Sequence, residues 1–339
     1  MDIKKPAKKA LYSFYANPLS KILYNSEIKK RSHLYLSEII PLSQKINMFA
    51  PFSPEIHKPN DWYGHAKIFK KFLGLSSGYK FKFTIEHGTY LDDEIADIDL
   101  EDNLPSIITY SKNRADILRH KKAHVFSIGP FIHYAPDFLS ENEFSKEKKR
   151  LGKNLLVFPM HSTMDTNFNF NITKLCRVIG KLGKDFNKIR ICLYWIDVLN
   201  GHYKIYQDFG FECVTAGHIL DPLFIPRLKS IIKLADYTIS NGISTHVAYN
   251  IFLNKPHYII PQKFHLSGNI KEIKTNSILV GSDPYKKILN AFSKPGLKIS
   301  AEQRRLVDYY WGMNEVKTKK EFLAIVDKTE SIYEELKKH

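Results

Sequence analysis

Three short polar segments, each at the end of an apolar run, carry the residues best suited to catalysis. The first is Glu86-His87-Gly88-Thr89, which follows the alternating run 81–85. Gly88 lets the chain turn tightly, so Glu86 and His87 project from the end of the predicted strand. A carboxylate or an imidazole placed there can take the proton of an attacking hydroxyl. Glu86 or His87 is therefore a candidate general base, and the alternative is a turn in which both are only solvated.

The second segment is His161-Ser162-Thr163, which follows the apolar run 155–158. A histidine at the end of a parallel strand can donate to a phosphate oxygen while negative charge develops on a leaving group. The hydroxyls of Ser162 and Thr163 can add hydrogen bonds to the same group. A structural histidine is the competing interpretation.

The third segment runs from Ser240 to Thr245, between the apolar run 237–240 and a helical pattern over 245–253. Gly242 permits a tight turn, and Ser244 and Thr245 fall where helix N-caps are expected. The free N–H groups of a helix N-terminus attract anions. This segment predicts a phosphate site formed by Ser240, Gly242, Ser244 and Thr245, and plain helix capping is the alternative.

Weaker candidates follow the other predicted strands of this half. Tyr194, Trp195 and Asp197 end one strand, and Gly217 and His218 follow another, so we expect them to line a nucleotide pocket. Acidic residues are frequent between 92 and 102, but they follow no apolar strand closely enough to predict a metal site. We interpret them as a solvated acidic loop comprising Asp92, Asp93, Glu94, Asp97, Asp99 and Asp102.

Short apolar runs alternate with amphipathic patterns from residue 46 onward, which is typical of parallel α/β units. In the first half we expect strands at 46–50, 81–85, 106–110 and 124–128, and helices at 61–73 and 113–120. In the second half we expect strands at 155–158, 189–195, 212–215, 237–240 and 257–260. The helices expected between them are 172–182, 202–209, 226–234 and 245–253.

The charged segment 136–153 has no apolar periodicity after Leu139 and marks the predicted domain boundary. We therefore expect an acceptor-side domain over 1–140, a nucleotide-donor domain over 151–300 and a helical tail over 301–339 that packs back on the first domain. A length of 339 residues suits two domains. Neither GxGxxG after a strand nor GxxxxGK[ST] occurs, which argues against dinucleotide and P-loop enzymes.

The formal net charge of +16 predicts attraction to a polyanion, either nucleic acid or an anionic membrane. Basic residues crowd the start of the chain, and the apolar stretch 11–24 among them could rest in a lipid headgroup layer. A solvated basic arm is the alternative. These basic residues are Lys4, Lys5, Lys8, Lys9, Lys21, Lys29, Lys30 and Arg31.

We predict a cytoplasmic protein, peripheral on the inner face of the plasma membrane if the arm binds lipid. No run reaches the length of a membrane span, and the cysteines at 176, 192 and 213 lie in or beside apolar stretches without metal or redox spacing. The aromatic residues fall within predicted strands, and the signatures of RRM, KH and helix-turn-helix domains are missing, so we do not expect nucleic acid as the partner.

Taken together, the three segments resemble the motifs of the GT-B bacterial sialyltransferases and related capsule-type transferases, which share Asp/Glu-Asp/Glu-Gly, His-Pro and Ser-Ser/Thr motifs. The resemblance is confined to short segments between residues 86 and 245. It implies two Rossmann-like domains facing a cleft and catalysis without metal or cofactor. By position, it makes Glu86 the base, His161 the phosphate ligand and acid partner, and Ser244 and Thr245 further phosphate ligands.

The same resemblance implies an inverting transfer of a nonulosonic acid, a sialic-acid-like sugar, from a CMP donor to a glycan or glycolipid acceptor of capsule or lipopolysaccharide. The acceptor would lie near residues 62–65. Two positions depart from the pattern, because His87 replaces the second acid and Ser162 replaces the proline. The His-Gly-Thr sequence also looks like the teichoic-acid-type polymerases that use CDP-glycerol or CDP-ribitol, in which that histidine is the base. Kdo transferases are a third relative, so the donor stays open among the three.

Overall fold

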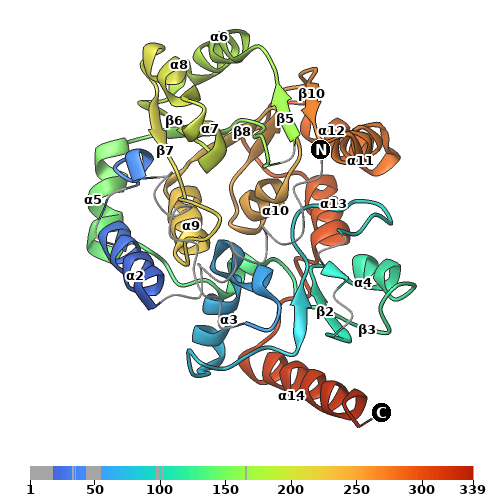
Figure 1. Ribbon diagram of the computed structural model, residues 1–339. Coiled ribbons are helices and arrows are strands. Elements are labelled where there is room, and N and C mark those ends of the chain that lie inside the picture. The colour runs from blue at the N-terminus through green and yellow to red at the C-terminus, as the bar shows by residue number, and fades with distance from the viewer. Residues whose placement is uncertain are drawn as a thin grey trace.

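The computed structural model describes residues 18–32, 34, 36–42, 55–96, 99–100, 103–164 and 166–338. Two α/β units lie one above the other, and the end of the chain returns to the first unit (Figure 1). Most of the basic arm and the strand predicted at 46–50 lie outside the described residues, as do Asp97 and Asp102. The three cysteines are free and buried.

The first unit is built on a parallel sheet of order β1-β2-β3. Its strands are β1 (Phe83–Ile85), β2 (Ser106–Thr109) and β3 (His124–Ser127), which confirms the strands predicted at 81–85, 106–110 and 124–128. Helix α4 (Lys112–Leu118) follows β2, and its N-cap Ser111 accepts a hydrogen bond from the backbone N–H of Arg114.

The helix expected at 61–73 begins later than predicted. Its regular part is α3 (His65–Leu73), and a 3-10 segment, η3 (Lys58–Gly64), precedes it. The two cannot form one helix, because Trp62 has ψ 141° and Tyr63 has φ 57°. Asn60 ties this turn to β1: its amide donates to the carbonyl of Phe83 at 2.8 Å and accepts from the N–H of Ile85 at 2.8 Å.

The second unit holds a five-stranded parallel sheet of order β7-β6-β4-β8-β9. If its strands are numbered along the chain, this is the order 3-2-1-4-5 of a Rossmann sheet. The central strand β4 is buried at every position, which explains the apolar run 155–158. The strands are β4 (Asn154–Phe158), β6 (Lys188–Cys192), β7 (Glu212–Val214), β8 (Tyr237–Ser240) and β9 (His257–Ile259).

Four helices of this unit lie where they were predicted: α6 (Ile172–Leu182), α8 (His202–Asp208), α9 (Phe224–Leu234) and α10 (Thr245–Phe252). The short helix α7 (Trp195–Leu199) was not predicted. Two parallel sheets with intervening helices confirm the predicted α/β fold with two Rossmann-like units. The strand predicted at 189–195 was too long, because β6 ends at Cys192 and Trp195 already begins a helix.

The segment 136–153, which we predicted as the domain boundary, contains helix α5 (Glu141–Leu151). A capping box between Ser140 and Glu143 starts it, and basic residues occupy its last turn. It buries only Glu147 and Leu151, so apolar periodicity could not reveal it. A second unexpected feature is the antiparallel pair β5 (Thr166–Asn169) and β10 (His265–Gly268).

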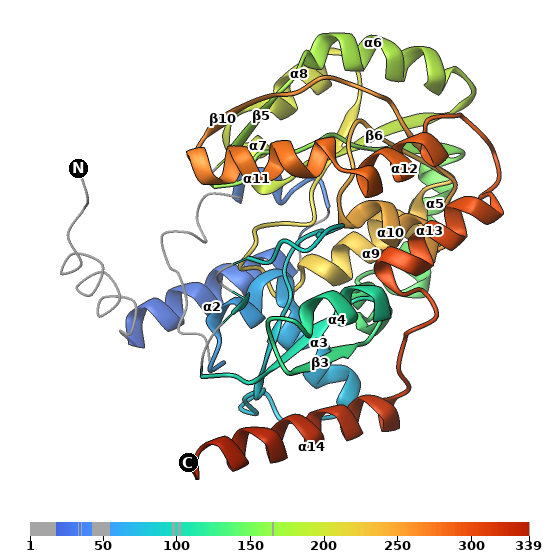
Figure 2. The same ribbon diagram turned by 90° about the vertical axis from the view of Figure 1, so that its right-hand side faces the viewer.

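The last helices join the two units. Helices α11 (Ile270–Gly281) and α12 (Asp283–Phe292) follow β10, and α13 (Ala301–Trp311) packs on both α10 and α4. Helix α14 (Lys319–Leu336) then lies along the first unit (Figure 2). The Phe322 ring is buried 5.2 Å from Phe69, measured between ring centroids, which confirms that the tail packs back on the first unit. Short 3-10 turns lie at Ile40–Leu42, Phe131–Tyr134 and Gly183–Asp185.

Helix α2 (Pro18–Ser32) is the described part of the basic arm, and one side of it is folded onto the second unit. The Tyr24 hydroxyl donates to the carbonyl of Leu220 at 2.8 Å, and Arg227 donates to the carbonyl of Arg31 at 3.0 Å. Arg227 also pairs with Asp221 at 2.7 Å, and both side chains are fully buried. Among the described residues no helix has the length and apolar character needed to cross a membrane.

The Arg227–Asp221 pair predicts a stability effect. Replacing Arg227 by Met leaves the Asp221 carboxylate buried without its partner and removes the contact with α2. We expect the free energy of unfolding to fall by about 3–5 kcal/mol in urea titrations. The matched control is Arg177→Met on the exposed face of α6, for which the change should stay within about 0.5 kcal/mol. Equal effects of the two substitutions would contradict this role of the pair.

Candidate functional site

Two of the three segments found in the sequence meet at the switch point of the second sheet. Strands β4 and β8 are neighbours, but the chain leaves them in opposite directions, toward β6 and toward β9. Their carboxyl ends therefore border the crevice in which Rossmann-type sheets bind ligands. The N–H of Met160 donates to Asn241 Oδ1 at 2.6 Å. A Cβ on Gly242 would lie 2.9 Å from Met160 Sδ, so the glycine lets the two loops pack closely without moving that side chain.

His161 lies half-buried at this crevice. Its ring centroid is 4.3 Å from that of Tyr194, and its Nδ1 lies 3.2 Å from the carbonyl oxygen of Ser162. In this arrangement Nδ1 carries a proton. The ring can then donate to a ligand from Nε2 only in its doubly protonated form.

Ser162 and Thr163 are occupied by the turn that leads to β5. The Ser162 hydroxyl accepts from the N–H of Phe168 at 3.3 Å, and the Thr163 hydroxyl accepts from the N–H of Thr166 at 3.0 Å. Ser162 is also buried, whereas Thr163 is exposed. The contacts of both hydroxyls thus stabilise the path of the loop that carries His161.

The residues of the third segment divide into two groups. Ser240 is fully buried, and its hydroxyl donates to the carbonyl of Gly242 at 2.7 Å. Ser244 and Thr245, by contrast, are half-buried at the N-terminus of α10. The Ser244 hydroxyl makes no capping bond to the helix and lies 2.7 Å from His246 Nδ1. Ser244 and Thr245 are therefore the two hydroxyls of this segment placed at the helix N-terminus.

His246, which we did not predict as a site residue, lies beside Ser244 at the N-terminus of α10. Its ring stacks on Phe158 at the end of β4, with centroids 4.9 Å apart and planes 8° from parallel. The side chain is 8% exposed, and its Nε2 has no hydrogen-bond partner among the described residues. Burial, followed by the nearby His257 and His161, holds the pKa of His246 well below its usual value, so its ring is neutral.

The five residues expected to line a nucleotide pocket are mostly packed. Trp195 and His218 are buried against each other with ring centroids 4.1 Å apart, and burial lowers the pKa of His218 to about 3. Asp197 is buried and accepts from the N–H of Ser162 at 3.4 Å. A Cβ on Gly217 would lie 3.0 Å from an Arg227 nitrogen. Tyr194 alone among the five is half-buried rather than buried.

Glu86, the first candidate base, is held in a buried network. It is 1% exposed, one carboxylate oxygen accepts from the Thr109 hydroxyl, and the other accepts from Arg114 Nε at 2.7 Å. Arg114 also donates to the carbonyls of Asp92 and Glu94, and so it fixes the acidic loop. Burial raises the pKa of Glu86, and the Arg114 guanidinium opposes that shift. Both oxygens of Glu86 are thus engaged in hydrogen bonds that stabilise the fold.

His87 is held differently. Its Nδ1 lies 3.2 Å from Asp99 Oδ1, and its backbone N–H donates to Asp99 Oδ2 at 3.2 Å. Its Nε2 is buried without a partner among the described residues. The Trp62 and His65 rings pack around it, with centroids 5.2 and 5.6 Å away. Asp99 is fully buried, so the structure contradicts its assignment to a solvated acidic loop.

The segment that carries Glu86 and His87, in the first unit, meets the N-terminus of α10, in the second unit. The hydroxyls of Thr89, two residues after His87, and Thr245, in the first turn of α10, are 2.9 Å apart. The hydroxyls of Tyr63 and Tyr194 are 3.0 Å apart, and the N–H of Tyr63 donates to the carbonyl of Ile219 at 2.6 Å. Within the described part of the chain no cluster of three His, Cys, Asp or Glu side chains is arranged to hold a metal ion.

The chain is similar to several solved structures, including the two described in this paragraph. No protein-family model matches the chain, and no match is found among curated proteins. The structure of the wall teichoic acid polymerase TagF aligns with 15% identity and a TM-score of 0.40, covering 69% of this chain and 59% of that chain. This chain therefore spans about three fifths of the polymerase chain. UGT89C1 of Arabidopsis thaliana aligns with 10% identity and a TM-score of 0.30, covering 95% of this chain and 74% of that chain. At these TM-scores the fold assignment rests on the strand order described above.

Proposed function

We propose that this protein is a glycosyltransferase whose C-terminal unit binds a cytidine-nucleotide donor at the switch point between β4 and β8. The proposal is carried by one observation: His87, whose Nε2 has no partner among the described residues, and the N-terminus of α10 belong to segments joined by the Thr89–Thr245 contact. One side of this junction can accept a proton, and the other can bind an anion. A transfer reaction from a phosphate-linked donor to a hydroxyl needs both.

His87 is the proposed general base. The Asp99 carboxylate accepts the proton on Nδ1, which leaves the lone pair of Nε2 to take the proton of the acceptor hydroxyl. As that proton leaves, the hydroxyl oxygen forms a bond to the anomeric carbon of the donor. The bond from this carbon to the donor phosphate breaks, and a single displacement inverts the configuration. Glu86 is a poorer base, because both of its oxygens are already hydrogen-bonded.

The donor phosphate is proposed to lie at the N-terminus of α10. The Ser244 and Thr245 hydroxyls and the free N–H groups of the first helical turn can donate to it, and the helix dipole favours its negative charge. In its doubly protonated form, His161 would donate from Nε2 to the oxygen that gains charge as the bond breaks. In this scheme Ser162, Thr163 and Ser240 shape the loops.

The donor and acceptor are proposed from the motifs. A CMP-linked nonulosonic acid, transferred to a capsule or lipopolysaccharide glycan, remains our first assignment. The His87–Asp99 pair specifically favours one alternative, the transfer of a polyol phosphate from a CDP donor, for which a histidine base is expected. In that reaction the hydroxyl attacks the phosphorus next to the polyol, CMP leaves, and the proton again goes to His87. Kdo transfer from CMP-Kdo uses the same residues as the first assignment.

A panel of nucleotides tests the donor class. CMP, CDP, UMP, UDP and GDP are each added to the protein, and its thermal unfolding is followed. A ligand present at 100 times its Kd stabilises the folded state by about 2.7 kcal/mol, so a cytidine nucleotide that binds should raise Tm by several degrees. The absence of a Tm shift with both CMP and CDP would refute the cytidine assignment.

Three variants test the base. We expect His87→Ala to lower kcat by about 100-fold or more, since general base catalysis contributes that much, while the Kd of the donor stays within about twofold. Asp99→Asn should lower kcat by less and leave donor affinity unchanged. Glu86→Gln should reduce stability, because it disturbs the pair with Arg114, but preserve turnover in the folded protein. Release of cytidine nucleotide is the readout. A folded Glu86→Gln protein as inactive as His87→Ala would return the role of base to Glu86.

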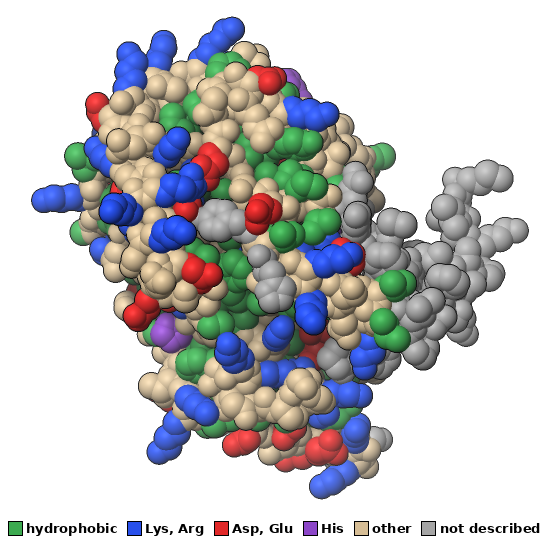
Figure 3. Space-filling view, turned by 90° about the vertical axis from the view of Figure 1, so that its left-hand side faces the viewer, with side chains coloured by type: hydrophobic (Ala, Val, Ile, Leu, Met, Phe, Trp, Pro, Cys, Tyr) green, Lys and Arg blue, Asp and Glu red, His purple; other side chains and the backbone are tan. Residues whose placement is uncertain are grey.

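We further propose that α2 rests on an anionic membrane surface. Its outward side exposes 64% of Ile22 and 37% of Leu23 beside the exposed lysines 21, 29 and 30, and the acid of this helix, Glu27, is buried. Figure 3 shows the side of the molecule on which α2 lies, with Lys and Arg side chains spread over it and fewer acidic ones between them. Apolar side chains flanked by lysines suit the headgroup layer of an anionic leaflet.

Co-sedimentation with vesicles tests this placement. The protein should bind vesicles containing phosphatidylglycerol and should not bind vesicles of phosphatidylcholine alone. The double variant Lys21→Glu, Lys29→Glu should bind about tenfold or more weakly, since each basic residue contributes about 1 kcal/mol at such a surface. Lys287→Glu, at an exposed position of α12, is the control and should bind normally. Equal binding of the double variant and the control would refute the proposed contact.

A further inference from the structure

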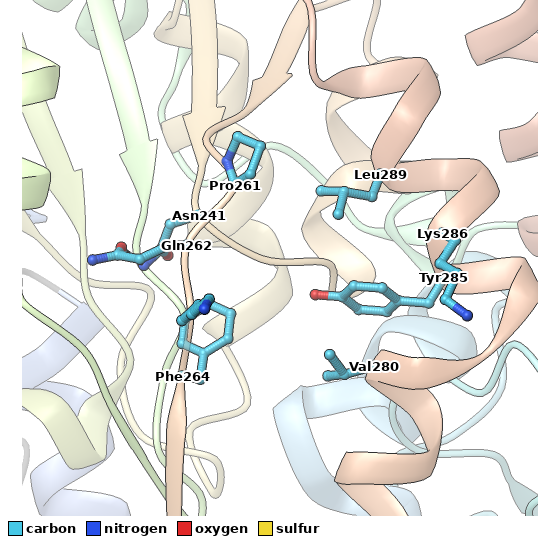
Figure 4. A pocket seen from close by; sticks show the side chains of 9 residues that line it. Asn241, Pro261, Gln262, Phe264, Val280, Tyr285, Lys286 and Leu289 are labelled. Atoms are coloured by element: carbon cyan, nitrogen blue, oxygen red, sulfur yellow. Dashed lines mark hydrogen bonds between the residues drawn. The ribbon is translucent and has the colours of Figure 1, made fainter.

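A cavity of about 360 Å³ lies beside the switch point, on the β9 side of the second sheet. Figure 4 shows its two walls. The residues that follow β8 and β9 form one wall, and helices α11 and α12 form the other. The side chains that line it are Asn241, Pro261, Gln262, Lys263, Phe264, Val280, Tyr285, Lys286 and Leu289. Its volume is near the lower end for ligand pockets, which suits one small ligand.

Direct contacts join this cavity to the proposed phosphate site. Asn241 lines the cavity, yet its Oδ1 holds the loop of His161 through Met160, and its Nδ2 donates to Gln262 at 2.8 Å. Tyr285, in the opposite wall, shares a hydrogen bond with the backbone of Ile243. Ile243 immediately precedes Ser244, the N-cap of α10, and only two residues lie between Asn241 and Ser244. A ligand in the cavity therefore lies within a few residues of the helix N-terminus.

The lining has the chemistry of a nucleobase site. Phe264 offers an aromatic face, and its ring is supported by Phe168 and Phe170, whose centroids lie 6.0 and 5.9 Å away. Val280 and Leu289 provide apolar surface, on which a flat heterocycle can rest. The Gln262 Nε2 donates to the carbonyl of Asn171 at 3.2 Å, and its Oε1, which accepts from Asn241, keeps a second lone pair for a donor on the edge of a base. Lys263 and Lys286, both exposed, add positive charge that suits a nucleotide.

We propose that this cavity binds the nucleoside of the donor, with its base against Phe264 and its phosphate directed toward α10. The inference rests on the proposed function and deepens it. It places the nucleoside on the β8–β9 side of the switch point, whereas the sequence led us to expect it on the β6–β7 side. There Trp195, Asp197 and His218 are buried in the packed interior and offer a base little surface.

Two variants of the cavity and one control test the inference by isothermal titration calorimetry with CMP and with ribose 5-phosphate, which lacks the base. Val280→Trp fills the cavity from α11, where Val280 is 37% exposed, and Phe264→Ala removes the aromatic face. Each should weaken CMP binding by about tenfold or more, because stacking on an aromatic ring contributes about 1–3 kcal/mol per base. Binding of ribose 5-phosphate should not change. Lys287→Trp, exposed on α12 outside the cavity, should bind CMP normally.

The outcomes separate this inference from the proposed function. If the unaltered protein binds CMP and both cavity variants bind it as well as Lys287→Trp does, the nucleoside lies elsewhere and the inference is overturned, while the cytidine donor stands. If the unaltered protein binds no cytidine nucleotide, both the donor assignment and this inference are refuted. Far-UV circular dichroism of each variant shows that it is folded, and two independent substitutions guard against the failure of one.

Discussion

The site depends on the turn at Tyr63 and Gly64, which joins the two units. Both residues have positive φ, 57° and 77°, and a Cβ on Gly64 would lie 2.4 Å from the carbonyl oxygen of Pro222. A tyrosine in this conformation is strained, and the strain persists because its N–H and its hydroxyl are both bonded to the second unit. The same turn places Trp62 and His65 around His87. The contact that fixes one unit on the other therefore also shapes the surroundings of the proposed base.

Neighbouring residues at one strand end have opposite roles because their partners differ. Glu86 faces a guanidinium and a hydroxyl, which satisfy both of its oxygens and commit it to the buried network. His87 faces a single carboxylate, which can satisfy only one ring nitrogen. A histidine bonded on one side keeps its other nitrogen for a substrate. The two roles thus follow from the number of partners that the fold supplies to each side chain.

Most of both sheets could be predicted from the sequence, because buried parallel strands are continuous apolar runs and the residues after them are polar. The same rule brought the segments at 161 and 240–245 to one crevice. It could not identify Asp99, because a carboxylate twelve residues from its histidine looks like its acidic neighbours until the loop closes. The position of His246 could not be predicted either, because its ring is oriented by stacking on Phe158, a contact that only the folded chain makes. Helix α5 escaped detection because capping and charge, rather than an apolar face, stabilise it.

The path of the final helix has a consequence for how the protein is made. Phe322 and Val326 complete the core of the first unit, but the ribosome adds them only after every strand of the second unit has been synthesised. Domains of a growing chain usually fold in order from the N-terminus. Here the core of the first unit is complete only when α14 has been synthesised, because Phe322 of that helix covers Phe69 and Tyr134. The unit that is translated second is thus the one able to finish its own core first.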